Sequence, residues 1–102
     1  MSSSSWVKVL NKSFTAGTYL FFARVMYPAN GSGQRYCYIG GGSGEVSLMS
    51  VSQPGNANGA SIVENVMIYQ LTATTTINIY GFQNSGSSLT GCSGILYYIK
   101  LK

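Results

Sequence analysis

The sequence predicts an all-β domain, a sandwich or barrel of short strands, and two observations carry this prediction. Runs of β-branched and aromatic residues recur along the chain, and clusters of Gly, Ser and Asn that are typical of turns separate them. No stretch repeats apolar residues at the three- and four-residue spacing of an amphipathic helix. Short strands with turn signals at this spacing are typical of sandwiches and barrels, so we expect little or no helix.

The expected strands follow one another from residue 6 to the end of the chain. They cover residues 6–10, 18–26, 34–39, 45–51, 61–71, 75–83 and 94–101. A turn runs through 12–17, glycines break the chain at 40–44, and the two longest polar loops are 52–60 and 84–92. We expect residues 1–5, a serine run, to be a linker or disordered start, and residues 6–102 to form a single domain, since 102 residues suffice for one domain.

Several of these strands are apolar on both faces. In 18–26, Tyr19 and Phe21 alternate with Leu20 and Phe22, and in 75–83 two isoleucines on one face alternate with aromatic rings on the other. A sandwich normally buries one face of each sheet, and large exposed apolar patches mark interaction sites. We therefore predict self-association, and the residues expected at the interface are Tyr80, Phe82, Leu96, Tyr98 and Phe22.

Charge is sparse: 8% of residues are charged, with a net charge of +4, against a hydrophobic fraction of 45%. The basic residues form no run, whereas nucleic-acid binding needs clustered cations that neutralise several phosphates. No apolar stretch approaches the roughly 20 residues of a membrane span. The serine-rich start has no apolar segment of the kind found in signal peptides. We predict no nucleic-acid partner and no membrane insertion.

The sequence contains few residues of the types that carry out catalysis. The chain has no His, and its two acidic residues are Glu45 and Glu64. A nucleophile–His arrangement is therefore impossible, and a glycosidase pair would need the two glutamates to meet across a site. The two cysteines, Cys37 and Cys92, permit one disulfide, but each sits in or beside an apolar run, so we favour free buried thiols. The sequence predicts no enzyme, no catalytic residues, no cofactor and no metal site.

What remains is recognition. Aromatic rings with polar handles suit interfaces and stacking on sugars, and polar loops carry binding residues more often than strands do. The alternative is that these rings pack in the core and the loops are merely solvated. The expected ligand contacts are Trp6, Tyr27, Asn30, Arg35, Tyr36, Asn56 and Asn58.

Three segments carry a resemblance to a known family. Phe14–Phe21, with its glycine and aromatic residues, resembles the segment near the start of C1q-like domains in the C1q/tumour-necrosis-factor superfamily. Cys92–Tyr97 resembles the closing F-S-G-F-L-L segment of that family, with Cys92 where the family usually has Phe, and 76–79 resembles the preceding strand. The resemblance covers about residues 14–101.

This resemblance implies a jelly-roll β-sandwich with ten-strand-like topology that forms a tight trimer around a hydrophobic axis. It also implies binding through apex loops and clefts between subunits. Compact, polar versions of this kind resemble the C-terminal heads of bacteriophage tail fibres. The function expected is a non-enzymatic trimeric receptor-binding head on a virion or outside a cell, attaching to a host-surface saccharide or protein. The alternatives are a purely structural trimerisation or capping module, and a C1q-like binding module of a bacterium.

Overall fold

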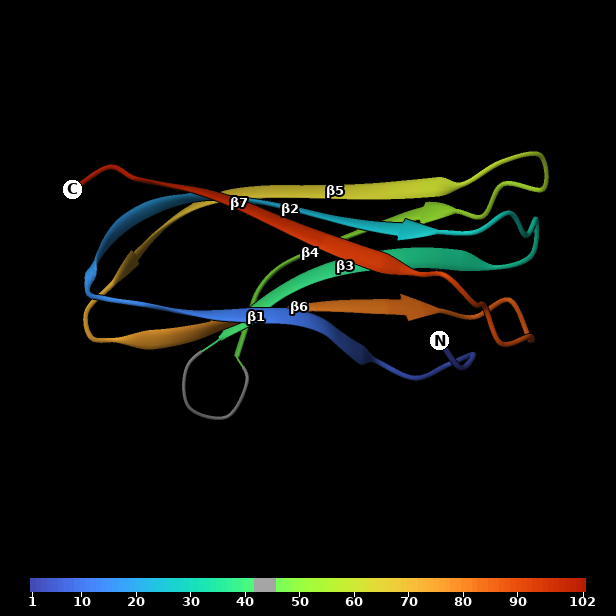
Figure 1. Ribbon diagram of the computed structural model, residues 1–102, viewed down its shortest axis with the longest axis horizontal. Helices are drawn as coiled ribbons and strands as arrows, with labels where there is room; N and C mark the ends of the chain where they lie inside the picture. Colours follow the sequence, from blue (N-terminus) through green and yellow to red (C-terminus); the bar gives the residue numbers. More distant parts are fainter. Residues whose placement is uncertain (42–45) are drawn as a thin grey trace.

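The computed structural model describes residues 1–41 and 46–102, with side chains for 1–41 and 51–102. The glycine-rich turn and Glu45 of the sequence prediction lie largely outside this part. The described residues form strands and no helix, and none of their segments could cross a membrane as a helix. The strands are β1 Val7–Phe14, β2 Gly17–Tyr27, β3 Gln34–Gly41, β4 Val46–Pro54, β5 Ser61–Leu71, β6 Thr75–Gln83 and β7 Ser93–Lys100 (Figure 1).

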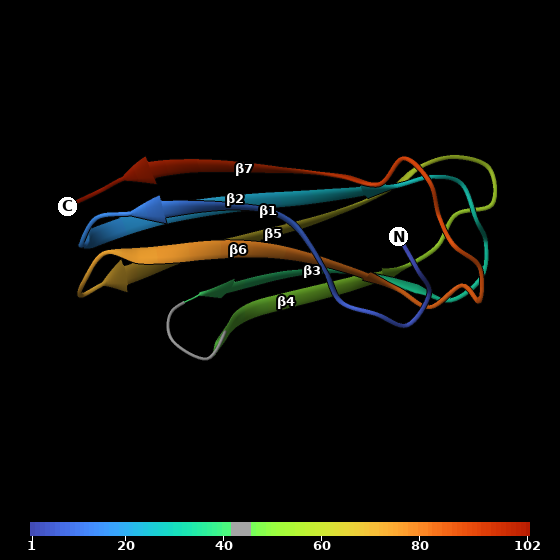
Figure 2. The same cartoon turned by 60° about the horizontal axis from the view of Figure 1, so that its bottom comes forward.

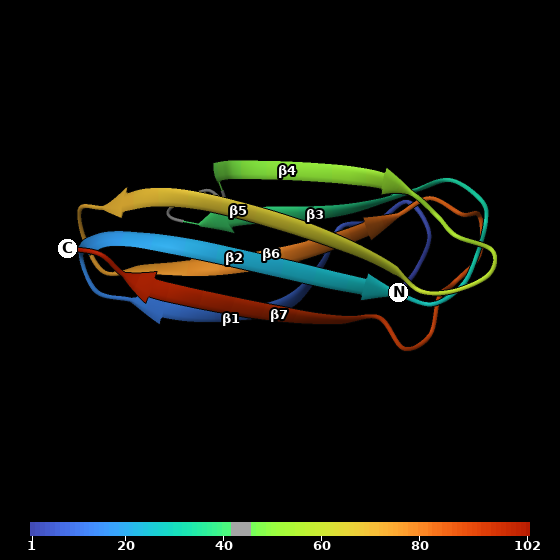
Figure 3. The same cartoon turned by 90° about the horizontal axis from the view of Figure 1, so that it is seen from above.

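Two antiparallel sheets lie face to face, as Figures 2 and 3 show. The strand order is β1-β6-β3-β4 in the four-stranded sheet and β5-β2-β7 in the three-stranded sheet. The predicted all-β sandwich is therefore confirmed, with seven strands in the described part rather than the ten implied by the resemblance. The first strand is longer than expected: it continues to Phe14, which pairs with Thr75, and the register shifts between Lys8 and Leu10.

The core lies between the inward faces of the two sheets. Phe21 and Val25 of β2 meet Ile39 of β3 and Ile77 and Ile79 of β6, and none of these side chains is exposed. The strand alternation read from the sequence is thus confirmed for β2 and β6. Because side chains alternate along a strand, the even-numbered residues of β2 project outward, away from this core.

Tyr27 joins the two layers. Its hydroxyl donates to the carbonyl oxygen of Tyr36 on β3 and accepts the backbone N–H of Phe82 on β6 at 3.0 Å. Burial, the largest cause, raises the pKa of Tyr27 to about 12. Gly81 leaves room for this bridge, because a Cβ there would lie 2.8 Å from the Tyr27 hydroxyl oxygen.

Residues at the start of the chain lie against the loop after β6. The Met1 amine donates to the Leu89 carbonyl, and the Met1 carbonyl accepts from the Leu89 N–H at 2.9 Å and from the Gln83 amide at 3.1 Å. The Ser4 N–H donates to the Gln83 carbonyl at 2.6 Å. Where the sequence predicts a linker or disordered start, the structure therefore has hydrogen bonds to the body of the domain.

Candidate functional site

The outward face of the three-stranded sheet is mostly apolar, and we call it the three-stranded face. On β2, Leu20 lies opposite Ile68 of β5 and Ile99 of β7, and Phe22 lies in the same way between Val66 and Tyr97. Of the side chains on the flanking strands, Ile68 is 64% exposed and Ile99 is 59% exposed. The full apolar set is Leu20, Phe22, Met26, Ile62, Val66, Ile68, Ile95, Tyr97 and Ile99.

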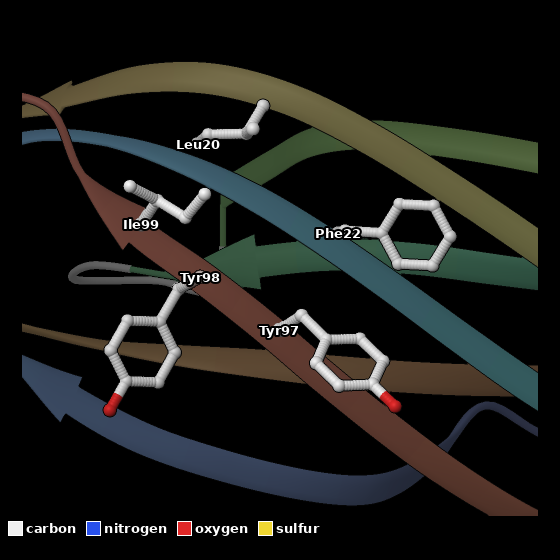
Figure 4. Close-up of a pocket in the computed structure, with 5 residues that line it drawn as sticks. All are labelled: Leu20, Phe22, Tyr97, Tyr98 and Ile99. Carbon is white, nitrogen blue, oxygen red and sulfur yellow. The ribbon is translucent and has the colours of Figure 1, made fainter.

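A shallow hollow of about 270 Å³ lies on this face, lined by Leu20, Phe22, Tyr97, Tyr98 and Ile99. Figure 4 shows Leu20 and Phe22 on β2 and Tyr97 and Ile99 on β7, with Tyr98 at the edge of the hollow, where its ring reaches from β7 toward β1. The only polar side-chain atoms in this lining are the two phenol oxygens, and they point away from one another. The hollow has the chemistry of a protein contact rather than of a site that orients a small polar ligand.

One ion pair interrupts the apolar surface. Arg24 and Glu64 are direct cross-strand partners, and the guanidinium donates to the carboxylate at 2.9 Å. The Arg24 guanidinium also lies 5.9 Å from the centre of the Phe22 ring. Within the described part of the chain, these are the charged side chains that the outward positions of β2 and β5 carry.

The outward face of the four-stranded sheet carries aromatic rings instead, and we call it the aromatic face: Trp6, Tyr36, Tyr38, Tyr80 and Phe82. Tyr36 lies opposite Phe82 and Tyr38 lies opposite Tyr80, each pair with ring centres 5.3 Å apart. Trp6, just before β1, packs on this group with its ring centre 4.8 Å from that of Phe82. It keeps 49% of its surface exposed.

At one end of the sandwich, Arg35 braces the loop between β2 and β3. Its side chain is fully buried and donates to the carbonyl oxygens of Asn30 and Ser32 at 2.8 Å and of Gln34 at 3.1 Å. Gly55 lies against the guanidinium, where a Cβ would come within 2.5 Å of Nη2. Arg35 therefore supplies hydrogen-bond donors to three backbone carbonyls of this turn.

The structure separates the predicted ligand contacts into three groups. Trp6 and Tyr36 lie together on the aromatic face. Asn30, Asn56 and Asn58 lie on the end loops, where the Asn30 and Asn56 side chains cap their own turns by accepting the N–H of Ser32 and of Asn58. Tyr27 and Arg35 are fully buried, so the structure gives them the structural roles described above and no surface for a ligand.

The predicted interface residues do not form one continuous patch. Phe22 lies on the three-stranded face, whereas Tyr80 and Phe82 lie on the aromatic face of the other sheet. Leu96 and Tyr98 project to the inward side of β7. Leu96 packs on the core there, and the centre of the Tyr98 ring lies 4.8 Å from that of the Phe14 ring. The sequence prediction missed Ile62, Val66 and Ile68, although their common parity in the strand 61–71 was a signal for them.

Both cysteines are free in the structure. Burial raises the pKa of Cys37 to about 12, and burial also raises the pKa of Cys92, which the N-terminal amine and Arg35 act to lower. At pH 8 the Cys37 thiol, with this pKa of about 12, is ionised in only about one molecule in ten thousand, and the thiolate is the reactive form.

We therefore expect a thiol reagent at pH 8 to modify native Cys92 slowly, to leave Cys37 unmodified, and to modify both thiols after unfolding. Intact-mass analysis of the labelled protein measures this. Rapid double labelling of the native protein, or a mass two hydrogens low before labelling, would contradict it.

The architecture of the chain is similar to that of proteins with solved structures. No protein-family model and no curated protein sequence matches the chain. Solved structures do match, with TM-scores near 0.6.

The globular domain of zebrafish complement 1qA is 14% identical with a TM-score of 0.62, over 88% of this chain and 68% of that one. Murine APRIL is 16% identical with a TM-score of 0.62, over 84% and 68%. Eiger TNF from S. frugiperda is 13% identical with a TM-score of 0.59, over 86% and 61%. At these identities the likeness establishes the fold alone, and the fold of this chain is the jelly-roll sandwich of C1q and TNF domains.

Proposed function

We propose that this chain is a non-enzymatic binding head that assembles as a trimer, with the three-stranded face at the subunit interface. The observation that supports this most strongly is the exposed aliphatic surface of β5 and β7, where Val66, Ile68 and Ile99 are each more than half exposed. Burying apolar surface contributes about 25 cal/mol per Å², so a second protein surface on this face is strongly favoured. Closed cyclic symmetry covers the same patch on every subunit.

The three-fold symmetry rests on the family resemblance. Strand alternation supports self-association but does not choose between a dimer and a trimer. The segments Phe14–Phe21 and Cys92–Tyr97 resemble C1q-like domains, which implies a trimer, and the shared jelly-roll fold supports that resemblance. We therefore propose three subunits around an axis lined by this face.

We place this head at the tip of a virion fibre, such as a phage tail fibre, where it attaches to a saccharide or protein on the host surface. The low content of charged residues and the loops rich in Ser, Asn and Gly support this setting. One observation favours the alternative of a purely structural trimerisation module. The end loops are held by internal hydrogen bonds of Arg35, Asn30 and Asn56 rather than presenting those groups to a ligand.

The oligomeric state tests the proposal directly. We expect light scattering at micromolar concentration to give three times the 10.9 kDa of the chain, with a single symmetric species. The mass should not fall on moderate dilution, because subunits held by a dry aliphatic interface have a low dissociation constant. A folded, soluble, monodisperse species of 10.9 kDa would refute the trimer.

A further inference from the structure

The two outward faces of the sandwich differ in chemistry, and this difference points to two occupants. The three-stranded face is built mainly from aliphatic side chains, which suit a dry contact between protein subunits. The aromatic face is built from rings, and four of its five side chains carry a polar group: the indole N–H of Trp6 and three phenol hydroxyls. Such side chains combine a flat apolar surface with hydrogen-bonding capacity.

The geometry of the aromatic face is that of a platform. Tyr36 and Tyr38 on β3 face Phe82 and Tyr80 on β6 in register, which makes a two-by-two array of rings. Trp6 packs on three of them, with ring centres 4.8 to 5.7 Å away.

The backbone accommodates this array at Gly40, where a Cβ would lie 2.6 Å from the Tyr38 ring. Since the neighbouring rings fix Trp6 on its inner side, its exposed surface is presented in a defined orientation.

Polar groups border the platform. Lys8 on β1 places its Nζ 6.0 Å from the centre of the Tyr80 ring, and Ser52 on β4 is exposed opposite Tyr36. Hydroxyl and ammonium donors therefore lie within the same face as the rings. A ligand that fits must offer an apolar C–H surface to the rings and hydroxyl groups to the border, and the pyranose ring of a sugar offers both.

We propose that the aromatic face is a saccharide-binding site, in which the exposed side of Trp6 stacks on a sugar ring and the hydroxyl groups of Tyr36 and Ser52 hydrogen-bond to sugar hydroxyls. This inference rests on the proposed binding function and gives that function a place and a ligand class. The face lies on the opposite layer from the three-stranded face (Figure 2), so assembly through the latter leaves it open. Each subunit then contributes one site, and a multivalent surface glycan gains affinity from all of them.

Trp6 is the single tryptophan of the chain, so its fluorescence reports on this face alone. The protein is titrated with cellohexaose, chitohexaose, maltohexaose and a heparin hexasaccharide, each to about 10 mM, well above a Kd of about 1 mM that a shallow site gives. We expect a saturable change in Trp6 emission with at least one of them. No saturable change with any of the four would overturn the inference.

Variants assign the binding to the face. We expect Tyr36→Phe, which keeps the ring, to weaken binding about threefold to tenfold, and Trp6→Ala, followed by calorimetry, to weaken it by at least about tenfold. The matched control is Tyr69→Phe, because Tyr69 is an exposed tyrosine of β5 outside the aromatic face. Equal weakening by Tyr69→Phe would count against the site.

Two further outcomes separate this inference from the proposed trimer. A Trp6 emission that shifts with protein concentration, without sugar, would make the aromatic face a contact between copies and overturn the saccharide site. A trimer that shows no sugar response refutes the site and leaves the assembly proposal intact, whereas a monomer that binds sugar refutes the trimer and leaves the site intact.

Discussion

If the proposed assembly is correct, replacing Ile68 by aspartate is expected to convert the trimer into a soluble monomer. Ile68 is the most exposed apolar side chain of the three-stranded face, so the change removes little from the protomer's own core. In the assembly it places a carboxylate in a dry interface, which costs several kcal/mol unless it finds a partner. We expect the dissociation constant of the assembly to rise by about 100-fold or more, measured by analytical ultracentrifugation across a dilution series.

The matched control for Ile68→Asp is Trp6→Asp, which places the same charge on the aromatic face. It should leave the mass unchanged, because that face stays in water. The opposite result would be a protein that Trp6→Asp dissociates and Ile68→Asp leaves intact. It would show that the interface includes Tyr80 and Phe82, which the sequence analysis predicts. Circular dichroism of both variants confirms that the strands are retained.

Replacing Arg35 by methionine is expected to give a large loss of stability. The partly buried carbonyl oxygens of Asn30 and Ser32 lose their Arg35 donor, whereas the Gln34 carbonyl keeps the N–H of Asn84. Each lost partner costs about 1–3 kcal/mol, so we expect the free energy of unfolding to fall by about 2 kcal/mol or more. For a domain whose total is about 5–15 kcal/mol this is a large share, and urea denaturation measures it.

Two comparisons make the Arg35 result interpretable. Arg35→Lys keeps the charge but offers no planar fork, so it should recover only part of the loss. Lys12→Met removes an exposed cation that lies 5.7 Å from the Tyr98 ring, and it should change stability by no more than about 1 kcal/mol. If Arg35→Met proved as stable as Lys12→Met, the structural role of the buried guanidinium would be wrong.

Most of the fold follows from local sequence signals. The boundaries of β5 and β6 agree with the predicted ranges, because strong alternation lies between clear turn residues. Local signals end the first strand at residue 10 because Lys12 and Ser13 indicate the start of a turn, yet their pairing with β6 keeps them extended. Pairing partners distant in the chain leave no trace in a local window.

The candidate surfaces were harder to predict than the strands. That some strands are apolar on both faces was visible, but strand alternation does not say which two outward faces belong to the same sheet. Strand alternation alone therefore assigns Phe22 and Phe82 to one interface, although their strands lie in different sheets. By residue type Tyr27 and Arg35 suggest surface recognition, whereas in the structure both are buried and hydrogen-bond to backbone groups. For Arg35 a signal existed, because it shares its parity with the buried Cys37 and Ile39.

The pairing of β2 with β7 sets the order in which the molecule folds. Tyr19 lies opposite Lys100, so β2 completes this pairing only with residues about 80 positions further along the chain. Such non-local pairing carries a large loop-closure entropy and places folding in the range of about milliseconds to seconds. During that interval the aliphatic edge of β2 has no neighbour on one side. The three-stranded sheet therefore closes only when β7 docks on β2, and the speed of that docking step decides between native assembly and aggregation.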